Sequence, residues 1–296
     1  MREIVLLTEK RYLSPKIKNT YIKNILLEDK LLEKALKSQG VESKRLAWEN
    51  YTTLQNNQHI LFRTPWNYFE KLNKFKSFLE ENKAKTTFIN SYDQVLWNLD
   101  KVYLLELNKQ GINIPETVFL KRGSEESLKK ICDEKNWVEV VVKPSVSAAG
   151  WETYHLRKES FSGFEEKFQL LLQNQNMLIQ AYQKKITSFG EISLMMIGGE
   201  YSHAVIKKAK RGEFRVQDDY GGTVEMYMAG IKEINFAKTV MKKLNFCPLY
   251  ARVDVILDNQ NTLALSELEL IEPEMWFRKN PNSVEKLAVE IKKRYF

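Results

Sequence analysis

The sequence predicts an α/β protein that becomes α+β towards its C-terminal end and divides into two or three lobes. Three observations support this. The chain has 296 residues, 43% of them hydrophobic and 11% aromatic, which is enough for a large core. Strand-like and helix-like segments alternate through residues 3–88. After residue 177, strand-like segments dominate instead, which is typical of antiparallel sheets.

The N-terminal part is predicted to be a small lobe with a largely parallel sheet. Apolar strands are expected at residues 3–7, 42–47 and 59–62, with amphipathic helices between and after them. Ligands of open α/β sheets bind beyond the carboxyl ends of the strands. Arg63 follows such a strand end, so its planar fork is a candidate for binding a substrate carboxylate. A surface arginine without a ligand is the alternative interpretation.

A mostly apolar helix is expected next, over residues 92–109. Ser91 and Gln94 have the spacing of a capping box at its start. Lys101 lies inside this apolar pattern. A buried lysine needs a partner, so Lys101 either reaches an anion or extends its charged end to water.

A second lysine ends a buried strand. Residues 138–142 are rich in valine, and Lys143 is followed by Pro144 and a loop of small residues, 145–150. An ammonium group and backbone N–H groups that converge beside such a loop suit phosphate oxygens. A plain hairpin turn with an exposed lysine is the alternative.

A hairpin near the C-terminus is the strongest candidate for a catalytic surface. Strands are expected at residues 250–257 and 262–271, joined by the turn-forming residues 258–261. Side chains alternate between the two faces of a strand. With a loop of two or four residues, one face carries four charged side chains, which are Arg252, Asp254, Glu267 and Glu269.

The predicted register places Asp254 opposite Leu265 and Arg252 opposite Glu267. Three carboxylates then share a face with one arginine, and this repulsion calls for a further cation. Mg²⁺ takes oxygen ligands and commonly combines carboxylates with nucleotide phosphates, so it fits this face better than zinc. A solvated strand face is the alternative, and a loop of odd length would separate the acids.

Composition excludes several classes of function. No apolar run approaches the roughly 20 residues of a membrane span, and the apolar core of residues 1–10 is too short for a signal peptide. We therefore expect no membrane partner and a cytoplasmic location. Cys132 and Cys247 are far apart and only three histidines are present, which argues against zinc and disulfide chemistry.

The net charge of +8 leaves two interpretations, a nucleic-acid surface or a preference for small anions. Most basic residues are lysines spread along predicted helices, where solvated helix faces are the ordinary case. The densest basic patch consists of Lys207, Lys208, Lys210, Arg211 and Arg215.

Taken in order, the motifs resemble those of the ATP-grasp superfamily, in particular the branch with bacterial glutathione synthetase and the ligases similar to O-ureido-serine cyclo-ligase. The resemblance covers nearly the whole chain. It is carried by RTPWNY (63–68), WNLDKVYLLELNKQGINIPET (97–117), VVVKPSVSAAGWET (140–153), IQAY (179–182), FGEISLMMIGGEYSHAVIKK (189–208), FRVQDDYGG (214–222), VDVI (253–256) and LSELELIEP (265–273).

The resemblance implies an ATP-grasp fold of three lobes. Residues 1–90 would form the Rossmann-like lobe that precedes the ATP-grasp lobes, residues 91–182 the small lid lobe with its connecting helix, and residues 183–296 the larger C-terminal lobe with an antiparallel sheet. ATP would bind between the last two lobes together with two Mg²⁺ ions, and Mn²⁺ would be able to replace Mg²⁺.

The resemblance also implies roles for individual residues. The loop after Lys143 has Gly150 as its single glycine, so hydroxyl groups of Ser145 and Ser147 would replace backbone contacts to the phosphates. The implied nucleotide-binding residues are Lys101, Lys143, Ser145, Ser147, Gln180, Ala181, Tyr182 and Glu191. The implied metal ligands are Asp254, Glu267 and Glu269, and the implied catalytic and substrate residues are Arg63, Lys207, Arg215 and Gln217.

The implied activity is an ATP-dependent ligase that activates a carboxylate as an acylphosphate and joins it to an amine or similar nucleophile. Its partners would be small-molecule or peptide substrates, a nucleic acid is not expected, and a homo-oligomer is compatible with the sequence. Two alternatives stay open. One is a nucleotide-binding module without turnover, and the other is a basic nucleic-acid-binding protein.

Overall fold

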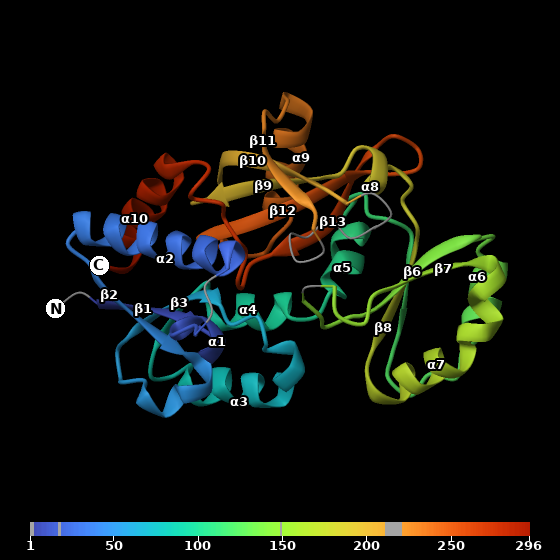
Figure 1. Ribbon diagram of the computed structural model, residues 1–296, viewed down its shortest axis with the longest axis horizontal. Helices are drawn as coiled ribbons and strands as arrows, with labels where there is room; N and C mark the ends of the chain where they lie inside the picture. Colours follow the sequence, from blue (N-terminus) through green and yellow to red (C-terminus); the bar gives the residue numbers. More distant parts are fainter. Residues whose placement is uncertain (1–2, 17–18, 149, 211–220) are drawn as a thin grey trace.

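The computed structural model describes residues 3–16, 19–148, 150–210 and 221–296. The described chain forms three sheets with helices packed on them (Figure 1). The N-terminal sheet is parallel, with strand order β2-β1-β3-β4. Its strands are β1 (Glu3–Thr8), β2 (Glu42–Ala47), β3 (His59–Thr64) and β4 (Thr87–Ile89), and its helices are α1 (Lys10–Leu13), α2 (Thr20–Ser38) and α3 (Leu72–Asn82). The predicted α/β N-terminal lobe is confirmed.

The small lobe is an antiparallel sheet with strand order β5-β8-β6-β7. Leu128, Phe161 and Phe168, from the two helices of this lobe, are buried with Val140 and Ile179 of the sheet in one core. The strands are β5 (Thr117–Leu120), β6 (Glu139–Pro144), β7 (Tyr154–Arg157) and β8 (Met177–Ala181), and the helices are α6 (Leu128–Glu134) and α7 (Phe161–Asn174).

The large lobe is a five-stranded sheet with order β11-β10-β9-β12-β13, and its strands pair antiparallel. The strands are β9 (Glu191–Ile197), β10 (Glu200–Lys208), β11 (Thr223–Tyr227), β12 (Tyr250–Leu257) and β13 (Leu263–Glu269), and the short helix α8 (Lys185–Ser188) and helix α9 (Ile231–Lys242) belong to the same part of the chain. Ala237 and Val240 of α9 pack with Val253 of β12, because the apolar stripe of the helix faces the sheet.

The helix predicted over residues 92–109 is interrupted, which corrects the sequence expectation. It consists of α4 (Tyr92–Asn98) and α5 (Tyr103–Lys109), and the predicted capping box of Ser91 and Gln94 is present. Lys101 lies in the break, where its backbone N–H donates to the carbonyl of Ser145 at 2.8 Å. The break therefore directs a buried lysine towards the small lobe.

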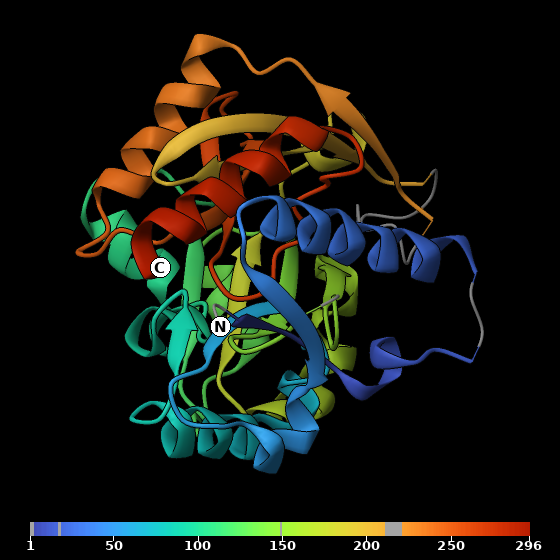
Figure 2. The same cartoon turned by 90° about the vertical axis from the view of Figure 1, so that its left-hand side faces the viewer.

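The C-terminal helix α10 (Pro281–Tyr295) lies beside α2, as both views show (Figures 1 and 2). Leu287 and Ile291 of α10 share one core with Leu32 and Leu36 of α2 and with Met195 of β9. This core joins the N-terminal lobe to the large lobe, so that the two can present one continuous wall. No helix within the described residues is long and apolar enough to cross a membrane.

Candidate active site

The three lobes meet around one cavity of about 600 Å³. Its wall includes Trp66 from the N-terminal lobe, Lys143 and Gln180 from the small lobe, and Asp254 and Glu267 from the large lobe. A cavity of this size, with apolar walls and a few converging charges, is the usual form of a small-molecule site.

A β-bulge brings the acids of the C-terminal hairpin to this cavity. The loop between β12 and β13 comprises five residues, 258–262, which is the odd length that would separate the acids in a regular ladder. The pairing shifts between Val255 and Asp254, because Ser266 is an extra residue on β13. Asp254 consequently lies opposite Glu267.

The observed register corrects the predicted one while confirming the shared face. Leu265 lies opposite Val255 instead of Asp254, and Arg252 lies opposite Glu269 instead of Glu267. The four predicted side chains nevertheless all line the cavity, namely Arg252, Asp254, Glu267 and Glu269.

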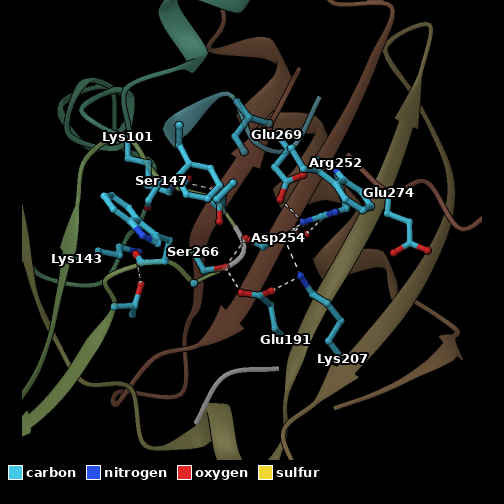
Figure 3. A pocket seen from close by; sticks show the side chains of 18 of the residues that line it. Lys101, Lys143, Ser147, Glu191, Lys207, Arg252, Asp254, Ser266, Glu269 and Glu274 are labelled. Carbon is cyan, nitrogen blue, oxygen red and sulfur yellow. Dashed lines mark hydrogen bonds and ion pairs between the residues drawn. The ribbon is translucent and has the colours of Figure 1, made fainter. Parts of the chain in front are cut away.

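Asp254 is the centre of a buried charge network (Figure 3). Its side chain is only 1% exposed, and both oxygens accept hydrogen bonds. Arg252 donates to them at 2.8 to 3.2 Å and also bonds Glu269, and Ser193 Oγ donates at 2.6 Å. Although burial opposes its charge, Arg252 and Lys207 lower the pKa of Asp254 below its usual range.

Lys207 belongs to the same network. Its Nζ lies 3.0 Å from Asp254 Oδ2 and also bonds Glu191. Burial disfavours its charge, but Asp254 and Glu191 raise its pKa. Ser266 Oγ donates to the other Glu191 oxygen at 2.7 Å. The structure thus places the predicted Lys207 and Glu191 on the cavity wall, where the lysine orients two carboxylates.

The donor set at this wall suits a hard cation only in part. Glu267 and Glu269 keep side-chain exposures of 32% and 23%, whereas Arg252 stands between Asp254 and Glu269. Among the residues that the structure describes, no three acids, histidines or cysteines form a ready metal cage. The predicted trio is therefore not preformed, since Asp254 is already committed to basic side chains.

The two partly exposed carboxylates of this wall, Glu267 and Glu269, differ in their electrostatic surroundings. Burial raises the pKa of Glu269 to about 8; Arg252 opposes the shift and Glu267 adds to it. Glu267 behaves differently, because Lys101 and Lys143 outweigh its burial and lower its pKa. Carboxylate oxygens that stay partly exposed fit Mg²⁺ bound together with phosphate groups.

Lys101 and Lys143 face the same end of the cavity (Figure 3). Lys101 is 7% exposed, so it does not extend to water. Its Nζ lies 3.1 Å from Glu267 Oε1 and 2.5 Å from the carbonyl oxygen of Ser147. Burial lowers the pKa of Lys143 to about 8, although Glu267 opposes this shift. Both lysines are placed to bind an anionic group.

The loop after Lys143 covers part of the cavity. Ser147, Gly150 and Trp151 line it, and the Trp151 ring lies 5.3 Å from that of Phe69 in the N-terminal lobe. Ser145 is fully buried and does not contribute to the described lining. The predicted contact of Ser145 with phosphate is thus unsupported, because its side chain points into the protein.

The predicted nucleotide-binding strand end forms another wall. Gln180, Ala181 and Tyr182 line the cavity together with Gln183, which the sequence analysis missed. Gln183 Oε1 accepts from the backbone N–H of Asn259, in the loop between β12 and β13. The side chain of Asn259 also donates to the carbonyl oxygen of Tyr182 at 2.9 Å, which ties the end of the small lobe to this loop.

Arg63 does not line the cavity in the described structure, which corrects its prediction as a substrate residue. It is buried, donates to Asp29 at 3.1 Å, and lies over the ring of Phe277. Asp29 comes from α2, and sequence patterns alone could not pair the two. Arg215 and Gln217 lie outside the described residues.

The sequence analysis also missed much of the wall formed by the N-terminal lobe. Glu272 belongs to the LSELELIEP motif. Its position, just after the strand that carries Glu267 and Glu269 and directly before Pro273, was the sequence signal that could have identified it. Trp66 stands in RTPWNY. The missed lining residues include Tyr12, Tyr21 and Tyr68 of the N-terminal lobe and, from the segment after β13, Glu272, Glu274 and Trp276.

Comparison with known proteins is consistent with this geometry. A curated relative, the cycloserine biosynthesis protein DcsG of Streptomyces lavendulae, is 25% identical over 261 residues, covering 81% of this chain and 85% of the relative. The crystal structure of D-cycloserine synthetase DcsG has a TM-score of 0.85 at 21% identity and covers 99% of this chain and 100% of that chain. D-alanine–D-alanine ligase from Bacillus anthracis has a TM-score of 0.67 at 13% identity, covering 100% of this chain and 97% of the other.

Two family models match the chain. The N-terminal domain of D-cycloserine synthetase DcsG matches residues 4–90, and the RimK-like ATP-grasp domain matches residues 99–272. The structural likenesses show the same fold at low identity, as the resemblance predicted. Because the second model spans more than half of the sequence, the chain belongs to the RimK-like ATP-grasp family of ATP-dependent ligases.

Proposed function

We propose that this protein uses ATP and Mg²⁺ to convert a substrate carboxylate into an acylphosphate and then joins it to an amine. The observation that carries the proposal is the meeting of Lys101 and Lys143 with Glu267 and Glu269 at one cavity wall. Phosphoryl transfer depends mainly on positioning and charge neutralisation, and this wall offers cations for phosphates beside carboxylates for a metal ion.

The proposed reaction has two steps. A carboxylate oxygen attacks the γ-phosphorus of ATP, and the bond between that phosphorus and ADP breaks. The amine nitrogen then attacks the acyl carbon, the bond to phosphate breaks, and the amine loses a proton. Water would hydrolyse the acylphosphate, so the loop that carries Ser147 and Trp151 would shield it.

Each nucleotide group has a counterpart in the cavity. Lys101 and Lys143 would bind phosphates, the segment 180–182 would hold the adenine, and Glu191 would accept from the ribose hydroxyls. Ser147 lines the same end as the lysines. Glu267 and Glu269 would hold a metal ion, which would supply positive charge to neutralise the phosphates. Asp254 would become a further ligand by giving up one of its hydrogen bonds with Arg252. We also propose that the site binds a second ion and that Mn²⁺ substitutes for Mg²⁺.

The remaining predicted residues are assigned to the substrates. Arg215 and Gln217 would contact the acyl group or the transferred phosphate, and Lys207 would hold Asp254 and Glu191 in place. The relatives are named for cycloserine and D-alanine, while another ATP-grasp ligase of this fold, PsnB, is seen with a precursor peptide. The match of the N-terminal lobe to DcsG supports a small amino-acid derivative. The cytoplasm is the proposed location.

ADP release in the presence of Mg²⁺ tests this function. Purified protein is screened with paired carboxylates and amines, and hydroxylamine is added in parallel to trap the acylphosphate as a hydroxamate. We expect ADP formation to require the carboxylate and to fall at least 100-fold in Glu267→Gln. Glu159→Gln, an exposed site in the small lobe, is the matched control.

Two results would contradict the proposal. Unchanged ADP formation in Glu267→Gln would remove the metal-binding role of this wall. ATP binding without ADP formation across the whole screen would favour the module without turnover.

A further inference from the structure

The cavity end formed by the N-terminal lobe differs in character from the lysine end. In Figure 3, Lys101 and Lys143 lie on one side of Asp254 and Glu274 lies on the other. The basic groups Lys101, Lys143, Lys207 and Arg252 all belong to the lysine and carboxylate walls described above. The cavity lining also contains the carboxylates Glu272 and Glu274, from the segment that follows β13.

Glu272 is the distinctive group at this end. It is 7% exposed, lines the cavity, and receives a hydrogen bond from the neutral hydroxyl of Tyr68. In the part of the chain described, no lysine or arginine forms an ion pair with it. Burial raises its pKa to about 7. A buried carboxylate without a basic partner is costly unless a ligand supplies the charge.

Lys101 and Arg252 lie close enough to Glu272 to lower its pKa, but both form ion pairs with other carboxylates. Two further basic groups are also engaged elsewhere. Arg278 pairs with both Glu274 and Glu28, and Arg11 donates to Glu9 at 2.5 Å. Arg11 is also largely exposed. Glu272 is therefore a buried carboxylate without an ion-pair partner among the described residues.

Aromatic rings complete this end of the cavity. Trp66 donates its indole N–H to the carbonyl oxygen of Glu272 at 3.0 Å, and its ring lies 5.5 Å from Tyr12 and 6.3 Å from Tyr21. Trp276 lines the same end, and its buried indole N–H has no hydrogen-bond partner among the described residues. Aromatic faces attract cations, and a carboxylate that lines the same cavity adds to this attraction.

We propose that this end binds the cationic group of a small amino-acid-like substrate, with its ammonium held by Glu272 against the ring of Trp66. The identification of the ligand as a substrate rests on the proposed ligase function. The binding itself depends on no nucleotide.

Saturation-transfer NMR on the nucleotide-free protein tests the proposal. The probes are D- and L-alaninamide, which carry an ammonium group, and N-acetyl-alaninamide, which is the neutral counterpart. We expect saturable binding of an alaninamide enantiomer and about tenfold weaker binding of the neutral probe, because a hydrogen-bonded charge contact is lost. Glu272→Gln should weaken alaninamide binding by a similar factor, whereas Glu159→Gln should not.

A second variant keeps the test decisive should Glu272→Gln unfold. Trp66→Leu retains the Glu272 carboxylate and removes the aromatic face. We expect it to weaken the binding of alaninamide more than the binding of N-acetyl-alaninamide. Equal binding of charged and neutral probes, or wild-type affinity in folded Glu272→Gln, would overturn the proposal. Since no ATP is present, absence of ADP formation in the ligase assay would leave this result standing.

Discussion

Lys101 Nζ lies 3.1 Å from Glu267 Oε1, and the same nitrogen donates to the carbonyl oxygen of Ser147. One side chain from the break between α4 and α5 thereby joins the loop of the small lobe to a carboxylate of the large lobe. A phosphate bound here would meet the ammonium group already in place, and such preorganisation is what phosphoryl transfer needs.

Lys101→Met should therefore weaken ATP binding at least tenfold and lower kcat/KM for ADP formation at least 100-fold. The free energy of unfolding should fall by no more than about 2 kcal/mol, because the remaining Glu267 is partly exposed. Calorimetry and urea unfolding measure the two quantities. Lys109→Met, at an exposed position of α5, is the control. Undiminished ATP affinity in Lys101→Met would exclude a phosphate contact.

The β-bulge makes a prediction about deletions. Removing Ser266 should leave a regular ladder in which Glu267 still lies opposite Asp254, so the protein should fold with a loss of about 1 to 2 kcal/mol from the missing hydroxyl contacts. Removing Leu268 should turn Glu269 towards the core and prevent folding, because a carboxylate would be buried among apolar groups. Circular dichroism during urea unfolding compares the two, and equal tolerance of both deletions would contradict the observed register.

Asp254→Asn should destabilise the protein by about 3 to 5 kcal/mol at pH 7, because Arg252 and Lys207 would stay buried with less negative charge around them. The pKa of Asp254 lies below its usual range, so its stabilisation is present above about pH 4 and is lost only as the pH falls through the lower folded-state value. The difference in free energy of unfolding between the wild type and Asp254→Asn should therefore become smaller at acidic pH.

Urea unfolding at pH 7 and pH 3 checks this expectation. Adding Lys207→Met to Asp254→Asn should recover part of the stability, since one buried cation is removed. Asp133→Asn, on the surface of the small lobe, should behave like the wild type. If the free energy of unfolding of Asp254→Asn lies within about 1 kcal/mol of the wild-type value, the charge network contributes little to stability.

Lys143 predicts a pH dependence of ATP binding. Burial lowers its pKa to about 8, so the ligand-free protein loses this charge as the pH rises through 8. A bound phosphate favours the charged form and raises the pKa again. ATP binding above pH 8 should therefore take up a proton, and affinity should fall by up to about tenfold per pH unit until the pKa of the complex is reached.

Calorimetry at pH 9 in two buffers of different ionisation enthalpy measures the proton uptake. Lys143→Arg keeps its charge throughout this range, so the part of the decline in ATP affinity that Lys143 causes should be absent between pH 7 and 9.5. An equally steep decline in Lys143→Arg would assign the pH dependence to another group.

Much of the fold was predictable because local patterns carry it. The alternation of Val253, Asp254 and Val255 predicts a strand with one charged face, and the spacing of Ser91 and Gln94 predicts a helix start that the structure confirms. The order of motifs predicted the ATP-grasp fold and the ligase class, and the family match confirms both.

The sequence by itself determined the class of the fold and most of its strands, and it marked the C-terminal hairpin as the charged one. Only the tertiary structure decided the pairing of Asp254 with Glu267, because the odd loop is offset by a bulge that Ser266 stabilises across two other strands. It also decided that Arg63 pairs with Asp29 inside the N-terminal lobe. Register and ion pairing depend on partners distant in sequence, and the periodicity of a single segment contains no information about them.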